Sequence, residues 1–270
     1  PGFSVAVVSA REDVPTQLTT MDFEVPTFEK KSAGRFIIKK YDTWVGLKTW
    51  DEIANGAMIP PPAVMESSLD VVKKMVRGMD LVDKKLGLEM EYLPVLCYND
   101  IAAAFPEAKL ENISDLFVFA RSVKTPEEIE MFRTLCRVAD EGFTAVSKIA
   151  KPGVSERELV ETFRRTVNAT GLAVPSAWSM FSTGESGSRL TLPGDGVIQK
   201  GDVVKFDAGV NAEFDFYTTD TSRSWVMEGA DPVLYKLKDR LYEGLQRMIA
   251  AAKPGLPICD LYHVAYDYVK

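Results

Sequence analysis

Apolar residues follow two different periods along the chain, and these periods separate strand-like from helix-like segments. In the first part, short apolar runs predict strands at residues 3–8, 35–38 and 86–92. Apolar positions at helical spacing predict helices over residues 62–86 and 96–105. This alternation indicates an α/β domain, whose strand order the pattern leaves open and in which no catalytic cluster is visible.

The pattern changes at residues 119–126, which we interpret as the junction between two domains. Beyond it, a long helix with apolar residues at helical spacing is expected from Pro126 to a Lys-Pro-Gly turn at 151–153, followed by a second helix that ends near Gly171. Each helix begins with a predicted capping box: Thr125 with Glu128, and Ser155 with Glu158.

An internal repeat links this helical hairpin to a later one at an offset of 102 residues. A Glu-Gly pair followed after eight residues by Lys-Pro-Gly stands at 141–153 and again at 243–255. Two apolar positions recur in the same register: Leu159 with Leu261, and Val167 with Val269. Two independently convergent helix–turn–helix units would give a similar pattern. The more specific interpretation is a duplicated domain, in which each half is a helical hairpin followed by β structure.

The β structure expected after the first hairpin carries the candidate chemistry. Strands are predicted at 203–209 and 216–226, with Asp207 in the first and Asp220 in the second. Aspartate is disfavoured in strands, and facing carboxylates repel unless a proton or a cation lies between them. A hard divalent ion would satisfy both. The alternatives are that both point to solvent, or that one pairs with a neighbouring cation: Lys205 or Arg223.

Composition narrows the class of protein. The 270 residues are 46% hydrophobic and 26% charged, which is typical of a folded domain or two, and the formal net charge is -7. Without a basic cluster, neither nucleic acid nor an anionic membrane is expected as a partner. No apolar stretch approaches the roughly 20 residues that span a bilayer. Three cysteines, an odd number, favour reduced thiols and a cytoplasmic location.

In this order and spacing, several segments resemble the pita-bread metallohydrolases, the family of Xaa-Pro aminopeptidases, prolidases and creatinases. The resemblance runs from Ala120 to Lys270 and continues more weakly through the N-terminal part. The segments that carry it are Arg121–Ile129, Lys151–Glu156, Lys200–Val204, Phe206–Gly209 and Thr219–Arg223. It implies an α/β (α+β) protein: a creatinase-like N-terminal domain over residues 1–120, then a pita-bread catalytic domain over 121–270 that is incomplete at its C-terminal end.

The resemblance also implies the chemistry. The first two metal ligands of the family fall on Asp207 and Asp220, and the family site holds two divalent ions, commonly manganese, cobalt or zinc. A His and two Glu from the second half would complete it. A metal-bridged hydroxide would then attack the scissile carbonyl of a small peptide. Relatives commonly form homodimers, so a homodimer is expected.

Two features depart from the family pattern. The two aspartates are 13 residues apart, two more than usual, but an even insertion leaves both side chains on the same face of the hairpin. In the His-x-x-Pro-x-Asp stretch of the family peptidases, the position of the His is Leu190 here. The single histidine, His263, matches no family ligand and is expected to be an ordinary helix residue. Trp178, Phe181 and residues 182–184 stand where relatives shape a substrate pocket.

Three functions remain open at this point. The first is a metallopeptidase similar to Xaa-Pro aminopeptidase or prolidase, and the second is a creatinase-like or ectoine-hydrolase-like enzyme acting on a small non-peptide substrate, which Leu190 favours. The third is a catalytically inactive pita-bread module used for binding. Since the chain starts with Pro1 and ends within a predicted helix, we expect it to be truncated, inactive alone, and a weak binder of metal or none.

Overall fold

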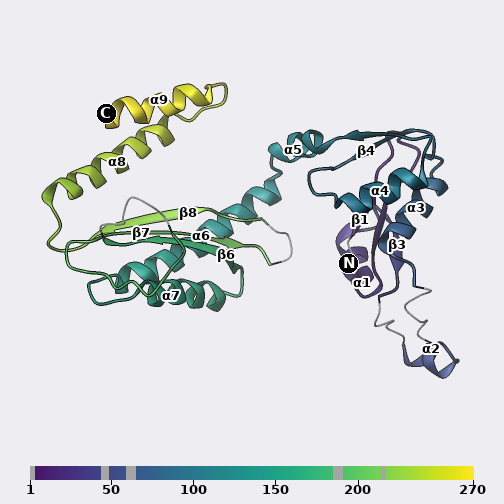
Figure 1. Cartoon of the computed structure of the whole chain (residues 1–270), viewed down its shortest axis with the longest axis horizontal. Coiled ribbons are helices and arrows are strands. Elements are labelled where there is room, and N and C mark those ends of the chain that lie inside the picture. Colours follow the sequence, from purple (N-terminus) through teal and green to yellow (C-terminus); the bar gives the residue numbers. More distant parts are fainter. Residues whose placement is uncertain (1–3, 44–48, 59–64, 185–190, 214–216) are drawn as a thin grey trace. The chain divides into compact units, whose positions relative to one another are not determined.

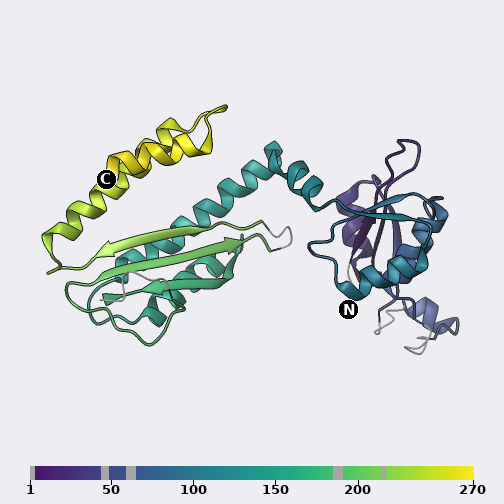
Figure 2. The same ribbon diagram turned by 45° about the horizontal axis from the view of Figure 1, so that its top comes forward.

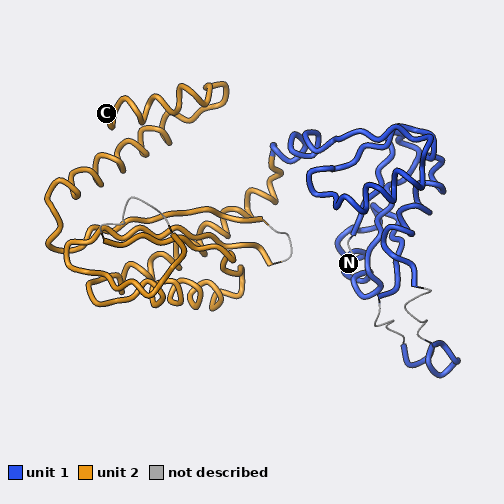
Figure 3. The backbone as a smooth tube through the Cα atoms, viewed as in Figure 1, with its two compact units in different colours: residues 1–123 blue, residues 124–270 orange. Residues whose placement is uncertain are grey.

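The computed structural model describes residues 4–43, 49–58, 65–184, 191–213 and 217–270 (Figure 1). It divides into two compact units, residues 1–123 and residues 124–270, which Figure 3 distinguishes by colour. Each unit is described by itself below.

Unit 1 is a mixed α/β unit with two small sheets. In the first sheet, β1 (Val5–Val7) pairs antiparallel with β2 (Gln17–Met21), which pairs parallel with β3 (Ile37–Tyr41). In the second, β4 (Lys85–Leu88) and β5 (Lys109–Asn112) are parallel. The helices are η1 (Asp22–Glu24), α1 (Val25–Ser32), α2 (Trp50–Ala54), α3 (Ser68–Gly78), α4 (Val95–Ala104) and α5 (Ser114–Ser122).

The main error in the predicted elements of unit 1 concerns the helix expected over 62–86. The helix observed there, α3, is shorter because Ser67 caps its start and the chain turns at Asp80, whose φ is 58°. The sequence pattern also missed β2, β5, α1 and α2. It placed the domain junction at 119–126; α5 covers residues 119–122 of this segment, and the two compact units divide after Val123.

Unit 2 contains the helical hairpin and hairpin of strands that the sequence predicted. Helices α6 (Pro126–Ile149) and α7 (Glu156–Ala169) cover one face of a three-stranded antiparallel sheet in the order β6–β7–β8 (Figure 2). The strands are β6 (Val174–Ser182), β7 (Val203–Asn211) and β8 (Thr221–Val226), of which β6 was not predicted. The capping box at Thr125 is formed, and Ser155 accepts the N–H of Glu158 as a helix cap.

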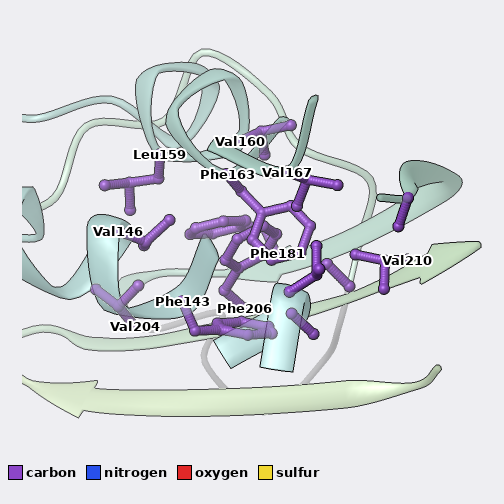
Figure 4. Packing of buried hydrophobic residues seen from close by; sticks show 14 of the residues in the cluster. Phe143, Val146, Leu159, Val160, Phe163, Val167, Phe181, Val204, Phe206 and Val210 are labelled. Atoms are coloured by element: carbon purple, nitrogen blue, oxygen red, sulfur yellow. The ribbon is translucent and has the colours of Figure 1, made fainter. Parts of the chain in front are cut away.

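The core of unit 2 lies between these helices and the sheet. Four aromatic rings meet there with centroids 4.8 to 5.4 Å apart: Phe143, Phe163, Phe181 and Phe206 (Figure 4). In β7, Val204, Phe206, Ala208 and Val210 are fully buried in this core. Because side chains alternate along a strand, the residues between them, Asp207 included, face the other side of the sheet.

The second helical hairpin consists of α8 (Pro232–Ala251) and α9 (Ile258–Val269), as the repeat predicted. Both hairpins turn at a glycine with positive φ, 93° at Gly153 and 87° at Gly255. Both also have a glycine where the two helices approach closely. A Cβ on Gly142 would lie 2.7 Å from the ring of Phe163, and one on Gly244 would lie 3.0 Å from Val269.

The two hairpins differ in what their apolar faces contact. Leu135 and Phe143 of α6 are buried in the core. The residues that correspond to them in α8, Leu237 and Leu245, are 46% and 50% exposed. The face of α6–α7 is therefore covered by the sheet, whereas the equivalent face of α8 is open to solvent in this chain.

Candidate functional site

The two aspartates singled out by the sequence lie on neighbouring strands of the unit 2 sheet. Asp207 is in the middle of β7, opposite Ser222 of β8. Asp220 was predicted inside the second strand but lies immediately before β8. The antiparallel pairing continues there, because the N–H of Thr219 donates to the carbonyl oxygen of Val210 at 2.9 Å. Asp220 therefore stands two positions from Ser222, on the same face as Asp207.

The electrostatics of the site centre on Asp207, which is partly buried. Burial raises the pKa of the Asp207 carboxyl above its ordinary value, and the Asp220 carboxylate raises it further through its charge and a hydrogen bond. The buried oxygen Oδ1 of Asp207 has no hydrogen-bond partner. Asp220 is exposed. Two carboxyl groups thus face each other, and one of them has an unsatisfied oxygen inside the protein.

Gly209 brings the backbone of the two strands unusually close beside the pair. A Cβ at this position would lie 2.0 Å from the carbonyl oxygen of Thr219 and 3.1 Å from the ring of Trp178. The side chain of Thr219 turns inward and accepts the N–H of Val210 at 3.1 Å. Only glycine fits at position 209. The close approach of the two backbones fixes the position of Thr219 and therefore of Asp220, the next residue.

Arg223 does not neutralise the site, although the sequence allowed it as a partner. Its guanidinium forms an ion pair with Asp140 of α6 at 2.8 Å and lies 5.3 Å from the ring centroid of Phe143. It is therefore on the helix-covered face of the sheet, opposite to the aspartates. Within the described ranges, Lys205 forms no ion pair with either aspartate.

The other residues considered from sequence are distributed as follows. His263 lies on α9, as expected, and its ring contacts that of Tyr262 at 5.5 Å between centroids. Phe181 is a core residue rather than part of a pocket, because it is fully buried against Phe206. Trp178 remains close to Gly209. Leu190 lies outside the described residues.

The donor set suits a hard divalent cation. Two carboxylates supply oxygen ligands, and a cation would give the unpartnered oxygen of Asp207 a partner and remove the repulsion between the charges. In the part of the chain that the structure describes, no third His, Cys, Asp or Glu joins them to form a larger group of ligands. The arrangement can therefore contribute two ligands to a metal site.

One residue that the sequence analysis passed over is Glu156, the first residue of α7. It is only 7% exposed, and its carboxylate accepts hydrogen bonds from the Thr183 hydroxyl at 2.7 Å and from the N–H of Gly194 at 2.8 Å. The signal available in the sequence was its spacing of three residues from the apolar Leu159, which places it on the inner side of the helix.

The chain is similar to metallopeptidases in sequence. The family model for metallopeptidase family M24 matches residues 130–270. The Xaa-Pro dipeptidase of Pyrococcus furiosus is 28% identical over 166 residues, which are 60% of this chain and 46% of that protein. An uncharacterized peptidase of Staphylococcus saprophyticus is 27% identical over 191 residues, 70% of this chain and 54% of that one. The chain thus spans about half the length of the curated relatives that it matches.

Solved structures confirm the predicted fold class. The X-Pro aminopeptidase from Thermotoga maritima superposes with a TM-score of 0.79 at 20% identity, over 99% of this chain and 67% of that one. An Xaa-Pro dipeptidase from Bacillus anthracis gives 0.79 at 21% identity, over 100% and 67%. At this identity the likeness concerns the fold. None of the described helices is both long and apolar enough to cross a lipid bilayer.

Proposed function

The chain belongs to metallopeptidase family M24, and on this premise we propose that the protein is a metal-dependent hydrolase of small peptides, similar to an Xaa-Pro dipeptidase. The observation that carries the proposal is the facing pair Asp207 and Asp220 on one open face of the sheet, with a buried carboxylate oxygen that lacks a partner. The Xaa-Pro dipeptidase of Pyrococcus furiosus, 28% identical over 166 residues, supports the substrate class.

We propose Asp207 and Asp220 as the ligands that this chain contributes to a divalent metal centre, with manganese, cobalt or zinc as the candidate ions. A bound divalent ion supplies Lewis acidity toward a peptide carbonyl and lowers the pKa of a water molecule. The chain's own residues do the positioning. Gly209 allows the backbone at Thr219 to approach β7 closely, and the packing of Phe206 in the core fixes β7, the strand that bears Asp207.

The test is dipeptide hydrolysis by the manganese-loaded protein at its full natural length. Asp207→Asn and Asp220→Asn should each abolish manganese-dependent turnover of an Xaa-Pro dipeptide. Asp267→Asn, an exposed aspartate on α9, serves as the matched control and should leave turnover unchanged. Activity that persists in Asp207→Asn, or that needs no metal, would refute the assignment.

A creatinase-like hydrolysis of a small non-peptide substrate is the second candidate, favoured by Leu190 at the position of the histidine in the family peptidases. The same preparations, assayed on creatine and on ectoine, distinguish the two. Turnover of either compound with none of the dipeptide would select this candidate. A protein that turns over none of these substrates would fit the inactive binding module instead.

We further propose the organisation that goes with this function. Residues 1–120 form a creatinase-like N-terminal domain and residues 121–270 belong to the catalytic domain. The protein acts in the cytoplasm, which its three free cysteines support. It acts as a homodimer, and exposed apolar side chains on α5 support this, among them Leu116 and Phe119 at 59% and 76% exposure. Light scattering of the full-length protein tests the dimer.

A further inference from the structure

Glu156 is the one charged residue among those that the fold buries in the described ranges. Burial of a carboxylate costs several kcal/mol unless hydrogen bonds compensate for the lost water. Here the helix N-terminus favours the negative charge. Thr183 and Gly194 donate to the carboxylate, and the N–H of Glu156 donates to the carbonyl oxygen of Gly196 at 2.9 Å. The charge is thus compensated by the helix N-terminus and by two donors that are distant in sequence, Thr183 and Gly194.

The contact is close on both sides. A Cβ on Gly196 would lie 2.9 Å from Oε1 of Glu156, so a glycine at this position leaves room for the carboxylate. Hydrogen bonds to a charged acceptor are about twice as strong as neutral ones. Glu156 therefore holds Thr183 and Gly194 more firmly than a neutral side chain would. On the outer side, Arg157 adds an exposed ion pair with Asp195 at 2.8 Å.

The segment held in this way borders the sheet that bears the aspartates. Thr191 exchanges two hydrogen bonds with Phe181 of β6, at 2.6 and 2.8 Å. The preceding residue of β6, Met180, stands opposite Asp207. Thr191 forms an isolated antiparallel bridge with Phe181, so the antiparallel register brings its neighbour Leu192 beside Met180, the residue of β6 that pairs with Asp207. Leu192 is 77% exposed, so its side chain is accessible to a bound ligand.

We propose that Glu156 is a positioning residue for the candidate active site. It fixes the segment from Thr191 to Gly196 so that Leu192, together with Met180, forms an apolar wall beside the two aspartates. An apolar side chain of the peptide substrate contacts this wall. The inference rests on the proposed peptidase function, and its two parts, positioning and contact, are measured separately.

Amide hydrogen exchange of the 270-residue chain measures the positioning. In Glu156→Ala, the amides of Thr191 and Gly194 should exchange roughly 5- to 150-fold faster, the range for the loss of a buried hydrogen bond. Exchange in β7 and β8 should stay the same. Glu156→Gln keeps one acceptor and should fall between, so it serves if the alanine variant does not fold. Glu158→Gln, exposed on the same helix, is the matched control.

Dipeptide kinetics measure the contact, in the manganese-loaded protein at its full natural length. We expect Glu156→Ala to raise KM for Leu-Pro about 10-fold, equivalent to ~1.4 kcal/mol, while KM for Gly-Pro and both kcat values change less than about twofold. Leu192→Ala should reproduce this KM effect without faster exchange at Gly194. A merely structural role for Glu156 would loosen the segment without changing the Leu-Pro to Gly-Pro ratio.

Each outcome decides a different point. Unchanged exchange at Gly194 in Glu156→Ala overturns the positioning role. A Leu-Pro to Gly-Pro ratio that Leu192→Ala leaves unchanged overturns the wall. Turnover of neither peptide by the unsubstituted protein refutes the proposed function and the substrate contact with it, while the exchange data still decide whether Glu156 fixes the segment.

Discussion

Asp207→Asn should stabilise the metal-free chain, although it removes a proposed metal ligand. In the native chain Asp207 has a buried oxygen without a partner and faces the Asp220 carboxylate. An asparagine has almost the same shape and no charge. Its amide can donate a hydrogen bond to Asp220, so repulsion is replaced by attraction.

Two contributions set the size of the effect. A buried polar atom left without a hydrogen bond costs about 1–3 kcal/mol. The two carboxyl groups lie within hydrogen-bond reach of each other, and two unit charges roughly 4 Å apart repel by ~1 kcal/mol in water and ~4 kcal/mol at an effective dielectric constant of 20. Because Asp220 is exposed, water screens the repulsion and the lower figure applies. We therefore expect a gain of about 2–4 kcal/mol at pH 7.

The gain depends on pH in a defined direction. Burial and Asp220 raise the pKa of Asp207 in the folded chain above that of the unfolded chain, which is about 3.9. The native chain therefore loses stability as the pH rises from the unfolded pKa through the folded one, and recovers it in acid. The advantage of Asp207→Asn should be complete at pH 7 and vanish near the unfolded pKa.

Urea unfolding in the presence of EDTA measures both the size and the pH dependence. Asp220→Asn removes the same repulsion and should also stabilise the chain. Asp267→Asn should stay within about 0.5 kcal/mol of the unsubstituted chain, as an exposed substitution. If Asp207→Asn proves less stable at pH 7, or if its advantage is the same in acid, the two carboxyl groups do not oppose each other as described.

Three further predictions follow from the geometry. Gly209→Ala should lower the free energy of unfolding by about 3 kcal/mol, since its Cβ would meet the backbone of Thr219; a urea-unfolding loss below ~1 kcal/mol would contradict this. Calorimetric titration of the 270-residue chain with manganese should give a dissociation constant weaker than about 100 µM, because two carboxylates are few of the six or more oxygen ligands such ions take; micromolar binding would contradict it. Hydrogen bonds to Ser67 lower the pKa of Asp70 to about 2, so Ser67→Ala should raise this pKa. The lowered pKa of Asp70 stabilises the folded chain above about pH 4, and this stabilisation is lost as the pH falls toward 2, so the variant should be less stable only above that range. An unchanged NMR titration of Asp70 would refute this.

The elements predicted well from sequence are those whose signals are local. The capping box at Thr125 and the Lys-Pro-Gly turn at 151–153 fix the ends of α6 through contacts a few residues apart. In contrast, β2 has the sequence Gln-Leu-Thr-Thr-Met, and Thr19 and Thr20 are fully buried because strands and helices from elsewhere cover them. No local pattern reveals that burial.

The same distinction explains what was predictable in the candidate site. Asp207 and Asp220 stood out because aspartate is unexpected in a strand-forming sequence. Glu156 did not, since a glutamate in the first turn of a helix is ordinary. Its role depends on Thr183 and Gly194, which are 27 and 38 residues away along the chain and come near only when the sheet has formed.

The repeated hairpin offers a comparison that normally requires a second protein. The two hairpins share few residues at equivalent positions. Among those shared are the glycines at the helix crossings, Gly142 and Gly244, and the glycines of the turns, Gly153 and Gly255. Most surface positions differ between the two hairpins, and even the size of an apolar residue differs, with Phe143 in the first and Leu245 in the second. The shared glycines therefore mark two different demands: at the crossings the facing helix leaves no room for a side chain, and at the turns the backbone needs a positive φ.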